Sequence, residues 1–336
     1  MPKKILTVGM GGTISAKNPE NTWESGEINQ ETLLKFLPFK RIKANARSAT
    51  LFRIDSSDVH PYHWMTLVKY ISYNIDSVDA IIVTHGTNSL AYTAAALSFM
   101  IQNPQIPIVI TGGMTPLNQP GSDSPINLED SFRVAIEGTP REVCVVFNHR
   151  IFRGSMVKKQ KAAEFDAFGS PDGPLGMVDQ AVGVFSKPRF KFRRRTIFPE
   201  LDPLVQFFKV TPAFDPDQIR WAIDRGYHGI VLDGYGIGKV PVNNEELMEI
   251  LEQARDRHYP ICLTTSCTLS PEWKPLYEKE TPRRLKELEL IPCMDMTPEA
   301  TLVKMMWVLA QTRDYKKIRT MMTANYVGEK KGEFVK

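Results

Sequence analysis

The chain contains 336 residues, of which 42% are hydrophobic and 24% are charged, and its formal net charge is +4. This length and balance are sufficient for two domains with substantial cores, and they exclude an intrinsically disordered protein. The clearest local excess of positive charge lies between Lys187 and Arg195, where phenylalanines alternate with the cations. We interpret this segment as a half-buried hairpin strand, because a nucleic-acid-binding protein usually has a broader basic face.

Neither the first residues nor the cysteines indicate secretion or metal binding. The apolar run at residues 5–8 is too short for the hydrophobic region of a signal peptide, and no run approaches membrane-spanning length. The four cysteines, Cys144, Cys262, Cys267 and Cys293, lack the CxxC spacing typical of zinc sites. Cys144 and Cys262 lie in apolar strand patterns, so we expect buried thiols in a cytoplasmic protein with no membrane or nucleic-acid partner.

The first predicted strand, residues 4–8, ends in a glycine-rich turn that leads to Thr13. The turn is similar to a dinucleotide-binding loop, but Ile14 stands where GxGxxG has its third glycine, and no convincing ribose-binding acid follows a second strand. We therefore expect the glycines to let the backbone approach a small ligand while Thr13 presents its hydroxyl. The polar residues 15–28, which include Trp23, are typical of a mobile lid or of an ordinary surface loop anchored by the tryptophan.

Small polar residues or glycines follow each of four predicted strands in the first 115 residues. The strands are residues 4–8, 49–54, 81–84 and 106–111, and the segments that follow them are residues 9–13, 55–58, 85–89 and 112–114. Helices are predicted at residues 29–37, around 64–71 and at 90–100, with Ser57 or Asp58 capping the second and Asn88 or Ser89 capping the third. This alternation predicts a doubly wound α/β sheet whose ligand site lies at the carboxyl ends of the strands.

The rest of the chain predicts a second, smaller α/β domain. Residues 122–125 are expected to cap a helix at 126–137, and an apolar strand follows at 142–148. We assign residues 1–186 to the N-terminal domain, 187–204 to a linker and 205–336 to the C-terminal domain. In that domain we expect strands at 205–210, 229–232 and 261–265, and helices at 216–225, 243–257, 271–287, 298–311 and 316–323.

The chemistry that these residues permit is narrow. The sequence contains neither a GxSxG nucleophile elbow nor an HExxH metal motif, so it indicates neither a serine triad nor a metal centre. What remains is a pair of strand-end hydroxyls, Thr13 and Thr87, and a lysine as the candidate base. A threonine becomes a nucleophile when a neighbouring base takes its proton, and a partly buried lysine with a lowered pKa can act as that base. Acyl transfer is the reaction class that fits.

Several motifs, in one order and spacing, resemble those of the bacterial and archaeal L-asparaginases, and most of all the archaeal or cytoplasmic type. They are residues 10–14 (MGGTI), 84–87 (THGT), 91–93 (AYT), 106–114, 165–168 (FDAF), 233–238 (DGYGIG) and 296–301 (MTPEAT). The resemblance implies a two-domain fold, with a larger N-terminal doubly wound sheet and a smaller C-terminal α/β domain. It also implies an amidohydrolase that acts on a small amide, uses no cofactor and completes its sites in a homodimer or homotetramer.

The resemblance also implies catalytic roles for three residues. Thr13 is expected to be the nucleophile or its partner, and Thr87 with Lys159 the second hydroxyl and its base. Lys159 is preferred over Lys158 because it aligns with the family's lysine when residues are counted back from the FDAF motif. These three side chains together constitute the catalytic group that the resemblance predicts.

The same comparison implies where the substrate is held. Asp55, Ser56 and Ser57 are expected in the substrate-binding loop, with Ser56 holding the α-carboxylate of the substrate. The oxyanion region is expected to be lined by Gly86, Thr87 and Gly113 through their backbone N–H groups.

Two positions depart from the family pattern. The family's HGTD motif ends here in Asn88, so the carboxylate that pairs with the substrate's α-ammonium and with the lysine is replaced by a neutral amide. Such a loss in a shielded site typically costs about 2–4 kcal/mol. In the lid, the family's tyrosine is replaced by Trp23, which has no hydroxyl to relay a proton to or from Thr13.

Three hypotheses about activity follow. The first is an asparaginase-like amidohydrolase whose substrate lacks a free α-ammonium or carries it differently; without a carboxylate neighbour, Lys159 has a lower pKa and is a better base. The second is plain L-asparaginase activity. The third is a catalytically silent homologue that binds a small acid or acts as a subunit or scaffold. Retention of Thr13, Thr87 and Lys159 favours chemistry, whereas Asn88 and Trp23 favour the silent alternative.

Overall fold

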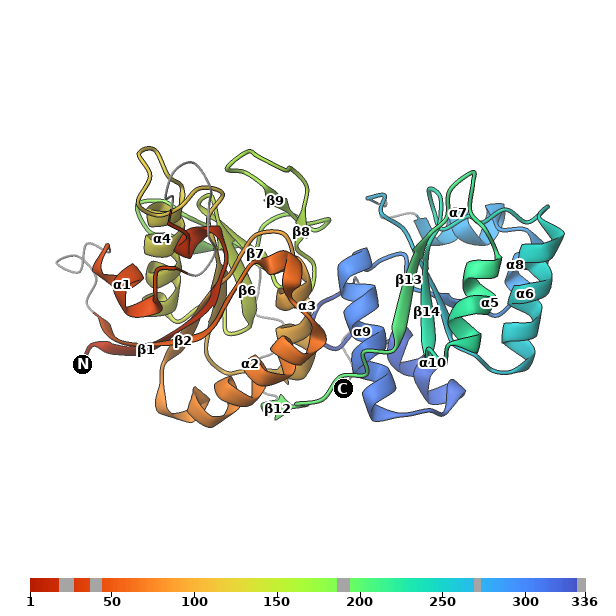
Figure 1. Cartoon of the computed structure of the whole chain (residues 1–336), viewed down its shortest axis with the longest axis horizontal. Coiled ribbons are helices and arrows are strands. Elements are labelled where there is room, and N and C mark those ends of the chain that lie inside the picture. The colour runs from red at the N-terminus through yellow and green to blue at the C-terminus, as the bar shows by residue number, and fades with distance from the viewer. Residues whose placement is uncertain (18–26, 37–43, 186–193, 269–272, 331–336) are drawn as a thin grey trace. The chain divides into compact units, whose positions relative to one another are not determined.

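The computed structural model describes residues 1–17, 27–36, 44–185, 194–268 and 273–330. The chain forms two compact units, Met1–Pro199 and Glu200–Lys336 (Figure 1). The predicted linker, residues 187–204, spans the boundary between the units, and its residues 187–193 lie outside the described part of the chain together with most of the basic segment.

The first unit is built on an eight-stranded mixed sheet. Five parallel strands take the order β2-β1-β3-β5-β6: β1 (Lys3–Gly11), β2 (Ala44–Ile54), β3 (Ala80–Thr84), β5 (Ile108–Thr111) and β6 (Val143–Phe147). Three antiparallel strands extend the sheet beyond β6: β7 (Arg150–Arg153), β10 (Gly176–Val178) and β11 (Val182–Val184). The strand order reverses between β1 and β3. In doubly wound sheets, ligands bind in the crevice at such a reversal.

Helices cover both faces of this sheet (Figure 1). The helices are α1 (Gln30–Lys35) and α4 (Ser124–Glu137) on one side, and α2 (Pro61–Asn74) and α3 (Leu90–Met100) on the other. On the α4 side, Ile82 and Val109 of the sheet share one core with Phe132 of the helix, all fully buried. Burial of each side chain of this size contributes about 1.5–3 kcal/mol. This packing fixes the strand ends that carry the polar turns.

Short elements complete the first unit. They are the 3₁₀ helices η1 (Thr13–Ser15), η2 (Ser56–Asp58) and η3 (Ile75–Ser77), the pair β4 (Ile101–Gln102) and β12 (Thr196–Ile197), and the hairpin β8 (Lys158–Lys159) and β9 (Phe168–Gly169). The sequence pattern did not predict this hairpin, because two-residue strands have no detectable hydrophobic period.

The second unit contains a four-stranded parallel sheet flanked by helices. Its strands, in sheet order, are β13 (Val205–Lys209), β14 (Gly229–Asp233), β15 (Ile261–Thr264) and β16 (Ile291–Pro292). Its helices are α5 (Asp217–Asp224), α6 (Glu245–Asp256), α7 (Trp273–Glu280), α8 (Arg283–Glu287), α9 (Pro298–Gln311) and α10 (Tyr315–Thr323). The single helix expected at residues 271–287 is wrong: it is broken into α7 and α8. Pro282 disfavours a helical conformation at Thr281 and takes an extended ψ of 145° itself.

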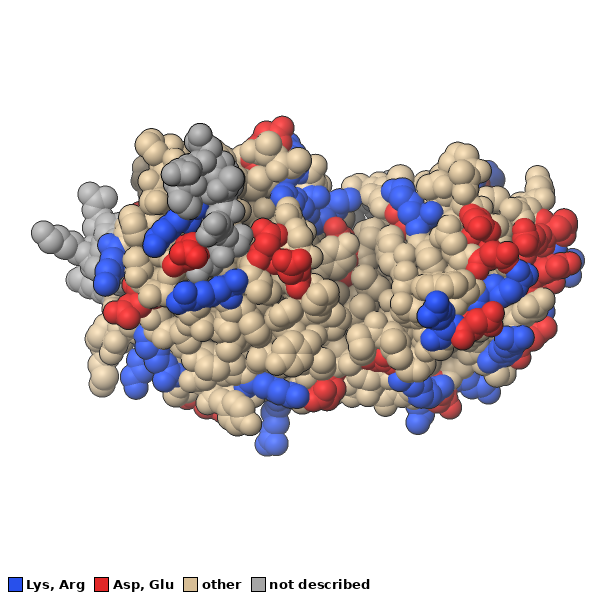
Figure 2. All heavy atoms as spheres, viewed as in Figure 1, with Lys and Arg blue, Asp and Glu red and all other residues tan. Residues whose placement is uncertain are grey.

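The surface and the thiols of the described residues are those of an ordinary globular chain. Acidic and basic side chains are interspersed on the visible face of the second unit (Figure 2), and Arg284 pairs with Glu245 at 2.8 Å. Cys144 and Cys262 are free and buried, which confirms the expectation for these two side chains. Within the described ranges, no helix is long and apolar enough to cross a bilayer.

The three expected helix caps have different outcomes. Helix α2 begins after His60, so neither Ser57 nor Asp58 caps it. Ser89 stands at the N-cap of α3 without a capping hydrogen bond, and its hydroxyl donates to the carbonyl of Ser56. Asp123 stands at the N-cap of α4, but its carboxylate accepts hydrogen bonds from the loop after β5 instead. Ser89 and Asp123 thus occupy the expected N-cap positions, but their side chains bind a neighbouring loop, and Asp123 also accepts from the Asn127 side chain of α4 at 3.0 Å.

Candidate active site

The turns after β1 and β3 meet backbone to backbone, and the side chain of Ser56, after β2, lies against them. Gly12 has φ 79°, and a Cβ atom there would lie 2.2 Å from the Cα of Gly86. A Cβ atom at Gly86 would lie 2.6 Å from the Oγ of Ser56. Side chains at the two glycines would therefore separate the turns. Because neither glycine has a side chain, the two turns can lie together. Thr13 follows Gly12 and Thr87 follows Gly86, so both threonines lie at the reversal of strand order, where a ligand is expected.

Lys159 reaches this place from the β8–β9 hairpin. Its Nζ donates to the Oγ1 of Thr87 at 2.9 Å and to the Oδ1 of Asn88 at 3.0 Å. The hairpin is anchored by Phe168, which pairs with Lys159 in the ladder and packs against Phe147 of β6 with ring centroids 4.9 Å apart. The predicted pairing of Thr87 with a lysine is thus present in the geometry, 72 residues apart in the sequence.

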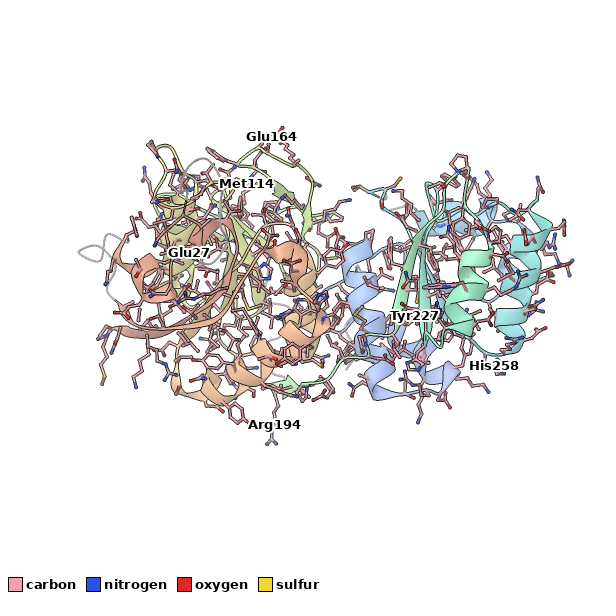
Figure 3. The ribbon with its side chains drawn as sticks, viewed as in Figure 1. Glu27, Met114, Glu164, Arg194, Tyr227 and His258 are labelled. Carbon is pink, nitrogen blue, oxygen red and sulfur yellow. The ribbon has the colours of Figure 1, made fainter. Side chains whose placement is uncertain are left out.

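The hairpin and the loop after β5 lie at the same end of the first unit. Figure 3 labels Glu164, in the loop between β8 and β9, and Met114, in the loop after β5, and both lie in the upper part of the first unit as drawn. The loops that carry the predicted site residues therefore converge from segments far apart in the chain.

The environment of Lys159 favours its neutral form more than water does. Burial lowers the pKa of the Lys159 ammonium below its ordinary value, and the negative charge of Asp55 opposes this shift. A larger neutral fraction makes the amine a better proton acceptor than a lysine in water. When the amine is neutral, the contact with Thr87 can reverse, so that the hydroxyl donates its hydrogen to nitrogen.

Asn88 connects the lysine to the loop after β2 without carrying charge. Its side-chain oxygen accepts from Lys159, while its Nδ2 donates to the Oγ of Ser57 at 3.1 Å. Its backbone N–H donates to the Oγ of Ser56 at 3.1 Å. Asn88 is exposed to solvent.

The loop after β2 is itself rigidly held. The Asp55 carboxylate accepts from the backbone N–H of Ser57 at 2.8 Å. Ser56 is buried; its hydroxyl oxygen accepts from Asn88, which leaves the hydroxyl hydrogen available as a donor. Such a hydroxyl is suited to a carboxylate, the group that the resemblance assigns to it.

Gly113 packs against the N-terminus of α4. A Cβ atom at Gly113 would lie 1.7 Å from the Oγ of Ser124, so only glycine fits. The buried Asp123 carboxylate accepts from Met114 N at 2.9 Å and from Thr115 N at 3.1 Å. These hydrogen bonds hold the loop that contains Gly113. The sequence pattern indicated only a helix cap at Asp123 and not this contact with the loop. Trp23 lies outside the described residues.

His85 is a second residue whose part in the site was missed. It is fully buried between the turn after β3 and helix α3, and it contacts the Gly86 carbonyl and the Thr93 hydroxyl. Burial lowers the pKa of His85 to about 4, against opposing contributions from the Gly86 carbonyl and Asp55. The pattern contained a signal, because Thr93 at position i+8 is one of the few polar residues on a mainly apolar helix.

The low pKa of His85 predicts an acid-sensitive fold. Because the folded-state pKa lies below the ordinary value of 6.5, the neutral ring stabilises the fold fully above pH 6.5, and this stability is lost as the pH falls toward 4. We expect the free energy of unfolding to fall by about 2 kcal/mol between pH 6.5 and about pH 5 through this group. Urea unfolding at several pH values measures the effect, with His85→Asn as the control that lacks it. Equal pH slopes in the two proteins would contradict the prediction.

The described residues offer no obvious metal centre. Among them, no group of three or more His, Cys, Asp or Glu side chains could hold a metal ion. The groups that the hydrogen bonds bring together here are the Thr87 hydroxyl, the Lys159 amine, the Asn88 amide and the hydroxyls of Ser56 and Ser57. This set is suited to acyl transfer from an amide.

Two family models match the chain. The model described as asparaginase, N-terminal, matches residues 4–190, and the glutaminase/asparaginase C-terminal domain matches residues 204–322. The chain belongs to the asparaginase family. The resemblance seen in the motifs and the predicted two-domain fold are confirmed, and the chain is an amidohydrolase.

Individual relatives span almost the whole chain. The L-asparaginase of Thermococcus kodakarensis is 37% identical over 331 residues, which cover 97% of this chain and 98% of the relative. Its solved structure has a TM-score of 0.89 at 36% identity and covers 98% of this chain and 100% of that chain. The structure of L-asparaginase I from Vibrio cholerae has a TM-score of 0.83 at 27% identity, with the same coverage. One subunit of the glutamyl-tRNA(Gln) amidotransferase of Pyrococcus horikoshii is 33% identical, and the match covers 97% of this chain and 76% of the relative.

Proposed function

We propose that this asparaginase-family protein hydrolyses a small carboxamide by threonine nucleophilic catalysis, with Lys159 as the base. The single observation that carries the proposal is the 2.9 Å contact between Lys159 Nζ and Thr87 Oγ1. This distance lies within the range for direct proton transfer between a base and a nucleophile.

The reaction proceeds through an acyl-enzyme. A threonine oxygen attacks the amide carbon of the substrate, and its proton passes to neutral Lys159, directly from Thr87 or from Thr13 through Thr87. Backbone N–H groups of Thr87 and Gly113 stabilise the oxyanion. The C–N bond then breaks, ammonia leaves with the proton returned by Lys159, and water hydrolyses the threonine ester to the free acid. Mass spectrometry of an acid-quenched reaction identifies which threonine carries the acyl group.

The site favours a substrate that has no free α-ammonium group, or one whose α-ammonium group does not bind at Asn88. A neutral amide attracts an ammonium much less strongly than a carboxylate does, and the difference is about 2–4 kcal/mol in a shielded site. Asn88 is neutral, so it does not oppose the effect of burial, which lowers the pKa of Lys159. The negative charge of Asp55 does oppose this effect. Succinamate and N-acylated asparagine are substrates of this description.

Ammonia release from a panel of amides tests the proposal. Asparagine, glutamine, N-acetylasparagine and succinamate are compared at equal concentrations, with protein produced in a host that lacks its own asparaginases. Thr13→Ala is the matched background control. We expect turnover of at least one amide, with the α-ammonium-free amides preferred over asparagine. Family-level activity on asparagine would contradict the altered preference, whereas no turnover together with tight binding of aspartate or succinate would contradict catalysis.

We also propose that the working form is a homodimer or homotetramer in the cytoplasm. The family resemblance supports the oligomer, and the buried free thiols support a reducing compartment. Light scattering coupled to size-exclusion chromatography determines the oligomeric state.

A further inference from the structure

We infer that His85 is a positioning residue that aims the backbone N–H of Thr87 at the substrate's oxyanion. It acts through the carbonyl of Gly86, and the inference rests on the function proposed above. His85 itself touches neither the substrate nor the reacting atoms.

The hydrogen-bond chain through His85 has one consistent direction. The Nδ1 of His85 lies 2.7 Å from the Gly86 carbonyl oxygen. A carbonyl can only accept, so Nδ1 carries the ring hydrogen and Nε2 is an acceptor. Nε2 lies 2.9 Å from the Thr93 hydroxyl, which must therefore donate to it. The Thr93 oxygen in turn accepts from the Nε1 of Trp64 at 2.9 Å.

This chain fixes the ring from two helices. Trp64 belongs to α2 and Thr93 to α3, and both side chains are buried. The indole N–H can only donate, so it orients the Thr93 hydroxyl hydrogen toward His85. The result is one tautomer and one ring orientation. Burial also keeps the ring neutral at neutral pH, so His85 is unsuited to be a general base there.

The planar peptide bond transmits this orientation to Thr87. In a trans peptide, the C=O of one residue and the N–H of the next point in opposite directions. A Gly86 carbonyl held inward by His85 therefore directs the Thr87 N–H outward. No described residue accepts a hydrogen bond from this N–H. An N–H that is fixed in direction and has no acceptor among the described residues is what oxyanion stabilisation requires.

Gly86 needs this constraint because it has no side chain of its own to hold it. The contacts with Gly12 and Ser56 exclude a Cβ atom at this position, and glycine has wide backbone freedom. The hydrogen bond from His85 removes the freedom of the Gly86–Thr87 peptide to rotate.

Two isosteric variants separate the two contacts of His85. In His85→Asn the amide nitrogen takes the position of Nδ1 and can still donate to Gly86. In His85→Gln the amide takes the position of Nε2 and can still contact Thr93, but the Gly86 contact is lost. Both variants remove part of the ring, so they share the loss of packing. We expect kcat to fall by about 10- to 100-fold in His85→Gln with little change in KM, and to stay within a few-fold of the native value in His85→Asn. Equal losses in the two variants, or a loss confined to KM, would overturn the inference.

A measurement independent of activity separates this inference from the proposed function. Nuclear magnetic resonance of protein labelled with ¹⁵N-histidine reports the tautomer of each of the six histidines, with His85→Asn providing the assignment. We expect His85 to carry hydrogen on Nδ1 alone and to remain neutral from pH 8 to about 5.5. An Nε2–H tautomer would overturn the inference. Absence of amide turnover in the native protein would overturn the proposed function and leave the tautomer result standing.

Discussion

Replacing Lys159 by methionine is expected to lower kcat for amide hydrolysis by about 10²- to 10⁴-fold. Methionine keeps much of the length of the side chain but removes the amine that contacts Thr87 and Asn88. The fold should tolerate the change, because a partly buried ammonium carries a desolvation penalty that a thioether does not. Steady-state ammonia release measures the effect, and a thermal melt verifies the fold.

The neighbouring lysine supplies the matched control. Lys158 lies next to Lys159 in β8, and successive side chains of a strand point to opposite faces. Lys158→Met should therefore retain most of the native kcat. A large loss of kcat in Lys158→Met, together with an active Lys159→Met, would show that Lys158 is the base. This result would contradict the proposed mechanism.

Replacing Asn88 by aspartate is expected to raise kcat/KM for L-asparagine by about 30- to 1000-fold. The new carboxylate would pair with the substrate's α-ammonium and with Lys159, whose Nζ already lies 3.0 Å from the Asn88 side-chain oxygen. Succinamate has no α-ammonium and should gain much less. Parallel kinetics on the two substrates therefore measure the specificity change.

The same variant should shift the pH profile. A carboxylate beside Lys159 raises the pKa of the ammonium, and a base is active only when it is deprotonated, so the acidic limb of kcat should move to higher pH. Asn244→Asp is the control: it makes the same charge change at the N-cap of α6, where aspartate is an equally good cap. If Asn88→Asp behaves like this control, the lid or the wider pocket limits activity on asparagine instead of Asn88.

The elements that the sequence predicted well are those with a strong local pattern. Helix α3 was expected at residues 90–100 and spans Leu90–Met100, because the polar turn before it and its long apolar run mark where it begins and ends. Strand β3 follows a short β-branched run of the kind that is buried on both faces. Such patterns also predicted the doubly wound sheet and, through it, the edge of the sheet at which a ligand site is expected.

Elements and contacts that depend on distant partners were missed. The β8–β9 hairpin has two-residue strands, and its position is determined by the packing of Phe168 on Phe147. Asp123 and Ser89 are of residue types that commonly cap helices, but the side chain of each binds a loop that lies nearby only after folding. A local pattern contains no information about these neighbours.

The sequence by itself determined the fold class, the polar strand ends and the motif residues Thr13, Thr87, Lys159 and Asn88, because local periodicity and motif spacing are properties of the chain alone. Only the tertiary structure decided that Lys159 reaches Thr87 and that a neutral His85 holds the turn beneath it. The reason is physical: hydrogen bonds and desolvation depend on which side chains folding brings within a few ångströms, and these partners come from strands and helices far apart in the sequence.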